Sequence, residues 1–278
     1  MGSRSRLAKP DRRLAELEEY RRRIEDDLRV AARVHRSLIP RSGRHGRLEI
    51  ACRFEPTDGI GGDYASVFFQ SDSRVVASIC DVEGHGIAAA LLASRVNSFV
   101  LNMAPRAEHP CEIGDALNAF VCDRFRDSGL FLTFFCLFLD LESRSLQYSG
   151  FGHPPVLLAK RNGGLRRIES ENPFIGVERE MTRNCSMLRL PFEPGDRLLL
   201  YTDGVSETAD PRDALLGVEG LARLVRDTAH LPLEQAVVAV FERIDAFGEG
   251  APLADDRLLL ALGFADDGPP APCGPPFL

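Results

Sequence analysis

Hydrophobic positions in the first 40 residues recur at alternating spacings of three and four residues. The series is Leu14, Leu17, Arg21, Ile24, Leu28, Ala31, His35 and Leu38, with Arg21 and His35 as imperfect members. This spacing is the heptad pattern of a coiled coil. Pro40 disfavours helical geometry in the residue before it, so we predict a helix that ends near Leu38. The helix either packs on its own domain or forms the seam of a parallel homodimer, and the pattern leaves both interpretations open.

After a linker at 41–47 that contains two glycines, the pattern changes to short apolar runs bounded by Gly, Asp, Asn or Pro. Such runs are typical of β-strands. The predicted strands are 48–54, 64–69, 75–80, 130–141, 146–149, 155–158, 165–168, 187–190, 197–201 and 257–264.

Helical spacing of apolar residues returns in a few segments between these strands. The predicted helices are 87–103, 112–126 and 233–247, with a shorter one at 218–226. Strands and helices do not alternate regularly, which disfavours a parallel doubly wound sheet. We therefore predict an α+β fold, a central antiparallel β-sandwich flanked by helical layers, over residues 41–264. The N-terminal helix occupies 1–40, and a Pro-, Gly- and Asp-rich tail at 265–278 is predicted to be disordered.

Composition is that of a globular protein, with 44% hydrophobic and 27% charged residues. The longest strongly apolar stretch, 131–139, is far shorter than the roughly 20 residues of a membrane span, and the N-terminus lacks the apolar core of a secretory signal. We expect a cytoplasmic protein. Seven cysteines without a CxxC pair are therefore predicted to be reduced thiols. The net charge of −7 argues against nucleic acid as the main partner.

Four aspartates occupy comparable places at the ends of predicted strands. Asp63 precedes one strand, Asp81 follows another, Asp203 lies just past a third, and Asp255 comes shortly before the last. One such aspartate alone is usually a turn residue or helix cap. Four that converge would repel one another unless a cation neutralised them. Oxygen ligands favour magnesium or manganese over zinc, so we predict a site for Mn²⁺ or Mg²⁺.

Glycines accompany these aspartates in Gly61-Gly62-Asp63, in 81–86 (DVEGHG) and in Asp203-Gly204. They allow sharp turns, and the carbonyl of Val82 becomes a further candidate ligand. Two cations roughly 3.5–4 Å apart would acidify a water and neutralise phosphoryl oxygens. Direct hydrolysis of a phosphate ester by water is therefore the predicted reaction. The sequence has no P-loop, GxSxG or HExxH motif, which argues against a P-loop nucleotide hydrolase, a serine hydrolase of that type and a zinc protease.

Several short motifs, taken together in order and spacing, resemble the SpoIIE-like serine phosphatases of the protein phosphatase 2C-like, metal-dependent (PPM) superfamily. They are 61–64 (GGDY), 81–86 (DVEGHG), 152–155 (GHPP), 194–196 (PGD), 201–205 (YTDGV) and 255–256 (DD), and the segment 31–40 resembles the linker helix of that family. The resemblance covers about residues 15–264. It implies a β-sandwich with outer helices and two bound cations.

The resemblance also assigns roles to residues. Asp81 would bridge both ions with the Val82 carbonyl on one of them, and Asp63, Asp203 and Asp255 would supply the other direct or water-mediated ligands. His85 is a candidate general acid or loop-fixing residue. Asp256 must point away from its neighbour if both lie in extended backbone, which makes it a candidate supporting residue rather than a direct ligand.

The same resemblance implies a protein serine/threonine phosphatase that acts on phosphoserine, typically on a STAS-type anti-anti-sigma factor in a bacterial partner-switching pathway. Two alternatives remain open: a catalytically weak or silent phosphatase-like module that dimerises and binds a signalling partner, and a hydrolase of small phosphate esters. Ala65-Ser66, Glu83 and Leu258 depart from the usual pattern of the family. None of these departures removes a predicted carboxylate ligand.

Overall fold

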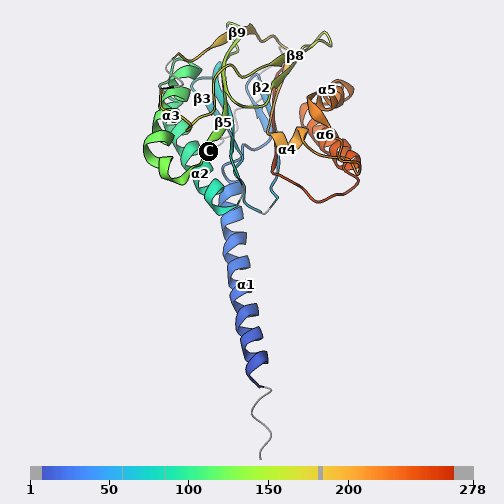
Figure 1. The fold of residues 1–278 in the computed structure, drawn as a ribbon. Coiled ribbons are helices and arrows are strands. Elements are labelled where there is room, and N and C mark those ends of the chain that lie inside the picture. The colour runs from blue at the N-terminus through green and yellow to red at the C-terminus, as the bar shows by residue number, and fades with distance from the viewer. Residues whose placement is uncertain (1–7, 58, 85, 181–183, 266–278) are drawn as a thin grey trace, which may run out of the picture.

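The computed structural model describes residues 8–57, 59–84, 86–180 and 184–265, and two antiparallel sheets form its centre (Figure 1). The six-stranded sheet has the order β1-β2-β11-β10-β7-β8, and the five-stranded sheet has the order β3-β4-β5-β6-β9. The strands are β1 (Gly43–His45), β2 (Leu48–Glu55), β3 (Tyr64–Phe69), β4 (Arg74–Val82), β5 (Leu132–Asp140), β6 (Ser145–Phe151), β7 (Val156–Ala159), β8 (Leu165–Ile168), β9 (Leu188–Pro191), β10 (Arg197–Tyr201) and β11 (Arg257–Phe264).

The two sheets pack face to face through apolar side chains, and β11 shows how. Side chains alternate between the faces of a strand. Leu258, Leu260 and Leu262 join the core between the sheets, whereas Leu259 and Ala261 join the cluster beneath the outer helices. Every residue of β11 is buried, which explains why its sequence after Arg257 is continuously apolar instead of alternating.

Helices cover both outer faces of the sandwich (Figure 1). Residues of α2 (Ile87–Met103) and α3 (Pro110–Phe125) share an apolar cluster with the five-stranded sheet. Residues of α5 (Gly217–Thr228) and α6 (Leu233–Phe247) share another with the six-stranded sheet. A short 3₁₀ helix (Arg126–Ser128) follows α3, and the one-turn α4 (Asp203–Ser206) follows β10. The predicted sandwich with helical layers is confirmed.

The N-terminal helix α1 (Ala8–Arg36) projects away from this body (Figure 1). Its apolar residues Leu14, Leu17 and Ile24 are 57%, 58% and 41% exposed. Only the C-terminal end meets the domain, where His35 is buried with its ring centroid 5.5 Å from that of Phe54. The predicted helix is confirmed, and its role in a homodimer stays a prediction. Within the described residues, no helix has the length and apolar character needed to cross a bilayer.

The cysteines require a correction, because Cys111 and Cys185 form a disulfide although reduced thiols were predicted. The two residues are 74 positions apart in the sequence, and their Cα atoms are brought to 5.8 Å by the packing of α3 beside the segment before β9. Sequence spacing carries no signal for such a pair. Cys52, Cys80, Cys122 and Cys136 are free thiols, and Cys273 lies outside the described residues.

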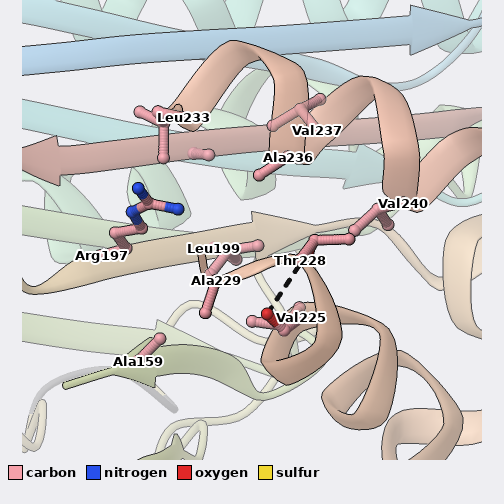
Figure 2. Close-up of a pocket in the computed structure, with 11 residues that line it drawn as sticks. Ala159, Arg197, Leu199, Val225, Thr228, Ala229, Leu233, Ala236, Val237 and Val240 are labelled. Carbon is pink, nitrogen blue, oxygen red and sulfur yellow. Dashed lines mark hydrogen bonds between the residues drawn. The ribbon is translucent and has the colours of Figure 1, made fainter. Parts of the chain in front are cut away.

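A small cavity lies between α5, α6 and the outer face of the six-stranded sheet (Figure 2). Its volume is about 20 Å³ and its lining is apolar apart from Arg197 and Thr228. The Thr228 hydroxyl bonds to the carbonyl oxygens of Leu224 and Val225 within its own helix. The cavity has room for about one water and none of the predicted site residues lines it, so it is a packing gap under the helices.

Candidate functional site

The β3–β4 pair positions the first two predicted carboxylates. Tyr64 faces Cys80 across the pair, which places Asp63, just before β3, beside Asp81 near the end of β4. The Val82 N–H donates to the Gly62 carbonyl oxygen over 3.3 Å. A Cβ at Gly62 would lie 2.6 Å from the Val82 carbonyl oxygen, so only glycine permits this close approach.

The other two predicted carboxylates come from the neighbouring β10–β11 pair of the six-stranded sheet. Tyr201 faces Leu259, so Asp203 after β10 and Asp255 before β11 lie at the same end of the pair. A Cβ at Gly204 would come within 2.1 Å of the Asp256 carbonyl oxygen. Glycine is therefore required beside Asp203 for the two backbone segments to meet.

Thr202 joins the two pairs. Its hydroxyl donates to Asp63 Oδ2 over 2.7 Å and accepts from the Leu258 N–H over 3.0 Å. All three groups are buried, so the hydrogen bonds form where unpaired polar groups are costly. Sequence reasoning missed Thr202, although its place directly before Asp203 in the 201–205 motif is a signal that could have identified it.

Asp256 anchors the loop before β3. Its carboxylate accepts from the N–H of Thr57 over 2.8 Å and from the N–H of Gly62 over 3.0 Å. The side chain is 4% exposed, whereas Asp255 is exposed and accepts from the Asp256 N–H over 2.7 Å. Asp255 and Asp256 thus lie in different surroundings, in agreement with the prediction that they point apart. Asp256 supports the backbone.

The carboxylates influence one another strongly. Burial, and next the charge of Asp81, raise the pKa of Asp63 well above its usual range. Burial, and next the charge of Asp203, raise the pKa of Asp81 to about 8. Burial, and next Asp255, raise the pKa of Asp203 to about 6. Without a positive charge nearby, these groups retain protons that ordinary aspartates lose.

The described residues do not contain three His, Cys, Asp or Glu side chains arranged around one point to hold a metal ion. The chemistry of the donors nevertheless suits Mg²⁺ or Mn²⁺, because all of them are oxygens: those of the carboxylates and the main-chain carbonyl oxygen of Val82. Mg²⁺ usually keeps several waters and takes only one or two carboxylates from the protein. Burial, together with the neighbouring carboxylates, disfavours the charged forms of Asp63, Asp81 and Asp203, and this provides the electrostatic reason for a cation here.

A cleft of about 510 Å³ opens beside these carboxylates. Acidic side chains form part of its lining, namely Asp81, Glu83, Asp203 and Glu207. The rest comes from Phe131, Thr133, Gly152, His153, Pro154, Phe174 and Val177. Glu83, one of the departures from the usual pattern of the family, lines the cleft. Glu207 and the apolar residues were not predicted. His85 lies outside the described residues.

His153 lines this cleft as a neutral imidazole. Its Nδ1 forms a 2.7 Å hydrogen bond with the Thr133 hydroxyl, and Thr133 faces Asp81 across the β4–β5 pair. Burial lowers the pKa of His153 to about 3. The ring therefore adds no positive charge at neutral pH and serves to position Thr133.

Comparison with known proteins agrees with this architecture. The protein IcfG of Synechocystis sp. is 23% identical over 242 residues, which is 77% of this chain and 37% of that protein. Phosphoserine phosphatase RsbU of Bacillus subtilis is 24% identical over 241 residues, which is 86% of this chain and 70% of RsbU. The chain thus spans little more than a third of one relative and most of the other.

Among solved structures, the SiaA-PP2C domain of Pseudomonas aeruginosa superimposes with a TM-score of 0.78 at 20% identity. The superposition covers 89% of this chain and 99% of that domain, which establishes a shared fold. The sequence model of the family described as Stage II sporulation protein E (SpoIIE) matches residues 71–265. These residues include most of the sandwich, with Asp81, Asp203 and Asp255. The chain belongs to the SpoIIE family.

Proposed function

We propose that this protein is a metal-dependent serine/threonine phosphatase that hydrolyses phosphoserine. The observation that carries the proposal is that Asp81 and Asp203, which follow strands of different sheets, line one cleft, and that the charge of Asp203 helps raise the pKa of both Asp81 and the buried Asp63. Mutual repulsion of this kind favours divalent cations, and divalent cations favour phosphoryl chemistry. The similarity to RsbU, a phosphoserine phosphatase, supports the same activity.

The proposed ligands are Asp63, Asp81, Asp203 and Asp255, together with the Val82 carbonyl. Two Mg²⁺ or Mn²⁺ ions, when bound, would neutralise the phosphoryl oxygens and activate water for attack on phosphorus. Thr202 orients Asp63 through its hydroxyl. Asp256 fixes the loop before β3 through two backbone N–H groups.

We further propose that the substrate is a cytoplasmic phosphoprotein of the STAS type in a partner-switching pathway. The support is indirect: it comes from family membership and from the likeness to RsbU. The cleft is open enough, at about 510 Å³, to admit a phosphoserine side chain with its neighbours.

Phosphate release from a phosphoserine protein, with Mg²⁺, Mn²⁺ or excess chelator present, tests the proposal. We expect release with either cation and none with chelator. Asp81→Asn should lower kcat at least a hundredfold, because it removes charge from the centre of the carboxylate group. Asp72→Asn, at an exposed turn residue, is the matched control and should retain wild-type turnover. Equal turnover with chelator would contradict the metal dependence.

A silent binding module is the second candidate, and one observation favours it: the described residues do not form a three-side-chain metal cluster. Such a module should bind cations weakly and release no phosphate. Metal titration combined with the phosphate assay separates the two candidates, since only an enzyme shows turnover that saturates with cation concentration.

A further inference from the structure

Part of the lining of the cleft consists of apolar side chains that the carboxylate chemistry does not use. Phe131, Phe174 and Val177 line the cleft together, and we call these three residues the apolar ledge. Phe174 is 41% exposed and Val177 is 55% exposed. Single exposed apolar residues are common, but neighbours that gather in a concave site indicate a binding surface.

The backbone beneath the ledge is fixed from one side by β5. Ile175 and Leu132 exchange two backbone hydrogen bonds of 3.0 Å. Both side chains are fully buried. Phe174 and Val177 lie on either side of Ile175 in the sequence. Their side chains are exposed, although the backbone between them is held by these hydrogen bonds.

Asn118 of α3 fixes the same segment from the other side. The fully buried Asn118 accepts from the Gly176 N–H over 2.8 Å and donates to the carbonyl oxygens of Glu178 and Arg179 over 3.0 and 3.1 Å. A buried amide that satisfies three backbone groups makes the loop costly to rearrange. The ledge is therefore a preformed surface.

The aromatic rings of the ledge are also fixed. Phe174 meets Phe131 edge to face, with centroids 5.6 Å apart and planes at 70°. Phe174 also lies against the Gly152 backbone, where a Cβ would come within 2.5 Å of the ring. These contacts hold the rings at the cleft instead of letting them fold into the core.

The same cleft is also lined by acidic side chains, namely Asp81, Glu83, Asp203 and Glu207. The cleft thus offers acidic groups that can hold the phosphoryl-binding cations and apolar groups that can contact another part of the same substrate. A small phosphate ester would leave the ledge uncovered. A peptide with phosphoserine beside an apolar residue would cover both sides.

We propose that the apolar ledge binds an apolar side chain adjacent to phosphoserine in the protein substrate and thereby selects the sequence that is dephosphorylated. This inference rests on the proposed phosphatase activity. Preformed apolar contact lowers the ordering cost of binding, and a hydrophobic subsite of this kind discriminates by about tenfold or more between substrates.

The test uses two phosphoserine peptides that are identical except for leucine or serine on both sides of the phosphoserine. The readout is the ratio of their kcat/KM values with Mn²⁺ present. We expect the ratio to be about tenfold in favour of leucine. Phe174→Ala should bring the ratio close to one, mainly through a higher KM for the leucine peptide. The ratio is insensitive to a general loss of fold or cation, which lowers both rates equally.

Val177→Ala is a second, milder variant because its side chain is already more than half exposed, and it should lower the ratio about threefold. Val238→Ala, at a 39% exposed position on α6, is the matched control and should keep the wild-type ratio. A wild-type ratio near one, or a ratio unchanged by Phe174→Ala, would overturn the inference if the wild type still hydrolyses p-nitrophenyl phosphate. If the wild type hydrolyses neither peptide nor p-nitrophenyl phosphate, the proposed function itself is contradicted, and the inference falls with it.

Discussion

At the scale of single residues, Thr202 connects the chemistry to the fold. Its hydroxyl group donates to the carboxylate of Asp63, just before β3, and accepts from the N–H of Leu258 in β11. Aspartate ligands are recognised in a sequence by their charge, whereas a threonine that orients them resembles any buried β-branched residue. For this reason, the carboxylates, including the supporting Asp256, could be singled out in the sequence, whereas Thr202 was missed.

Thr202→Val keeps the shape of the side chain and removes its hydroxyl. We expect the free energy of unfolding to fall by about 1–3 kcal/mol, because a buried acceptor and a buried donor lose their partner. Urea denaturation measures this change. Thr202→Ser retains the hydroxyl and is the control. If the serine variant is destabilised as much as the valine variant, the loss arises from packing and not from the hydrogen bonds.

The lowered pKa of His153 determines how this residue changes the stability of the fold in acid. Its pKa is about 3 in the folded protein against an ordinary value of 6.5, so below pH 6.5 the unfolded chain binds a proton that the native state excludes. Stability contributed by the neutral ring is complete above pH 6.5 and is lost as pH falls towards 3. The loss at pH 5 is about 2 kcal/mol.

Unfolding free energies of the wild type and His153→Asn at pH 7 and pH 5 check this prediction. The variant should lose less stability than the wild type over this interval, because asparagine does not titrate. Equal pH dependence of the two proteins would show that His153 does not control the response.

At the scale of elements, apolar periodicity located nearly every strand and helix. The ranges predicted for α2, α6 and β11 match the structure, because long apolar or amphipathic segments are specified by their own pattern. The misses are short. Strand β1 lies inside the predicted linker, and the one-turn α4 has too few residues to show a period. Their form depends on neighbouring elements.

Strand β11 should dominate the stability of the sandwich, since it is buried along its whole length between β2 and β10. Leu260→Ala removes a fully buried side chain from the core between the sheets. We expect a loss of about 2–5 kcal/mol, measured by chemical denaturation. Leu188→Ala, at a 45% exposed position on β9, is the matched control with an expected change of about 0.5 kcal/mol or less. Equal losses would contradict the assigned core.

At the scale of the whole molecule, the sandwich brings distant sequence positions to one cleft. Asp63 and Asp81 lie beside strands of the five-stranded sheet, and Asp203 follows a strand of the six-stranded sheet, yet the charge of Asp203 helps raise the pKa of both Asp63 and Asp81. The convergence of all four aspartates on one metal site stays a prediction, although Asp81 and Asp203 line the same cleft. The apolar ledge was not predicted, because Phe174 and Val177 reach the cleft through a loop whose path is set by Asn118 and β5, and Phe131 joins them from the position just before β5.

Calorimetric titration with Mn²⁺ tests the central claim most directly, because it measures whether these carboxylates hold a cation. We predict saturable binding by the wild type, at least a tenfold weaker affinity for Asp81→Asn, and unchanged affinity for the exposed-site variant Asp72→Asn. A wild-type protein that binds no Mn²⁺, or an Asp81→Asn variant that binds it with wild-type affinity, would contradict the account.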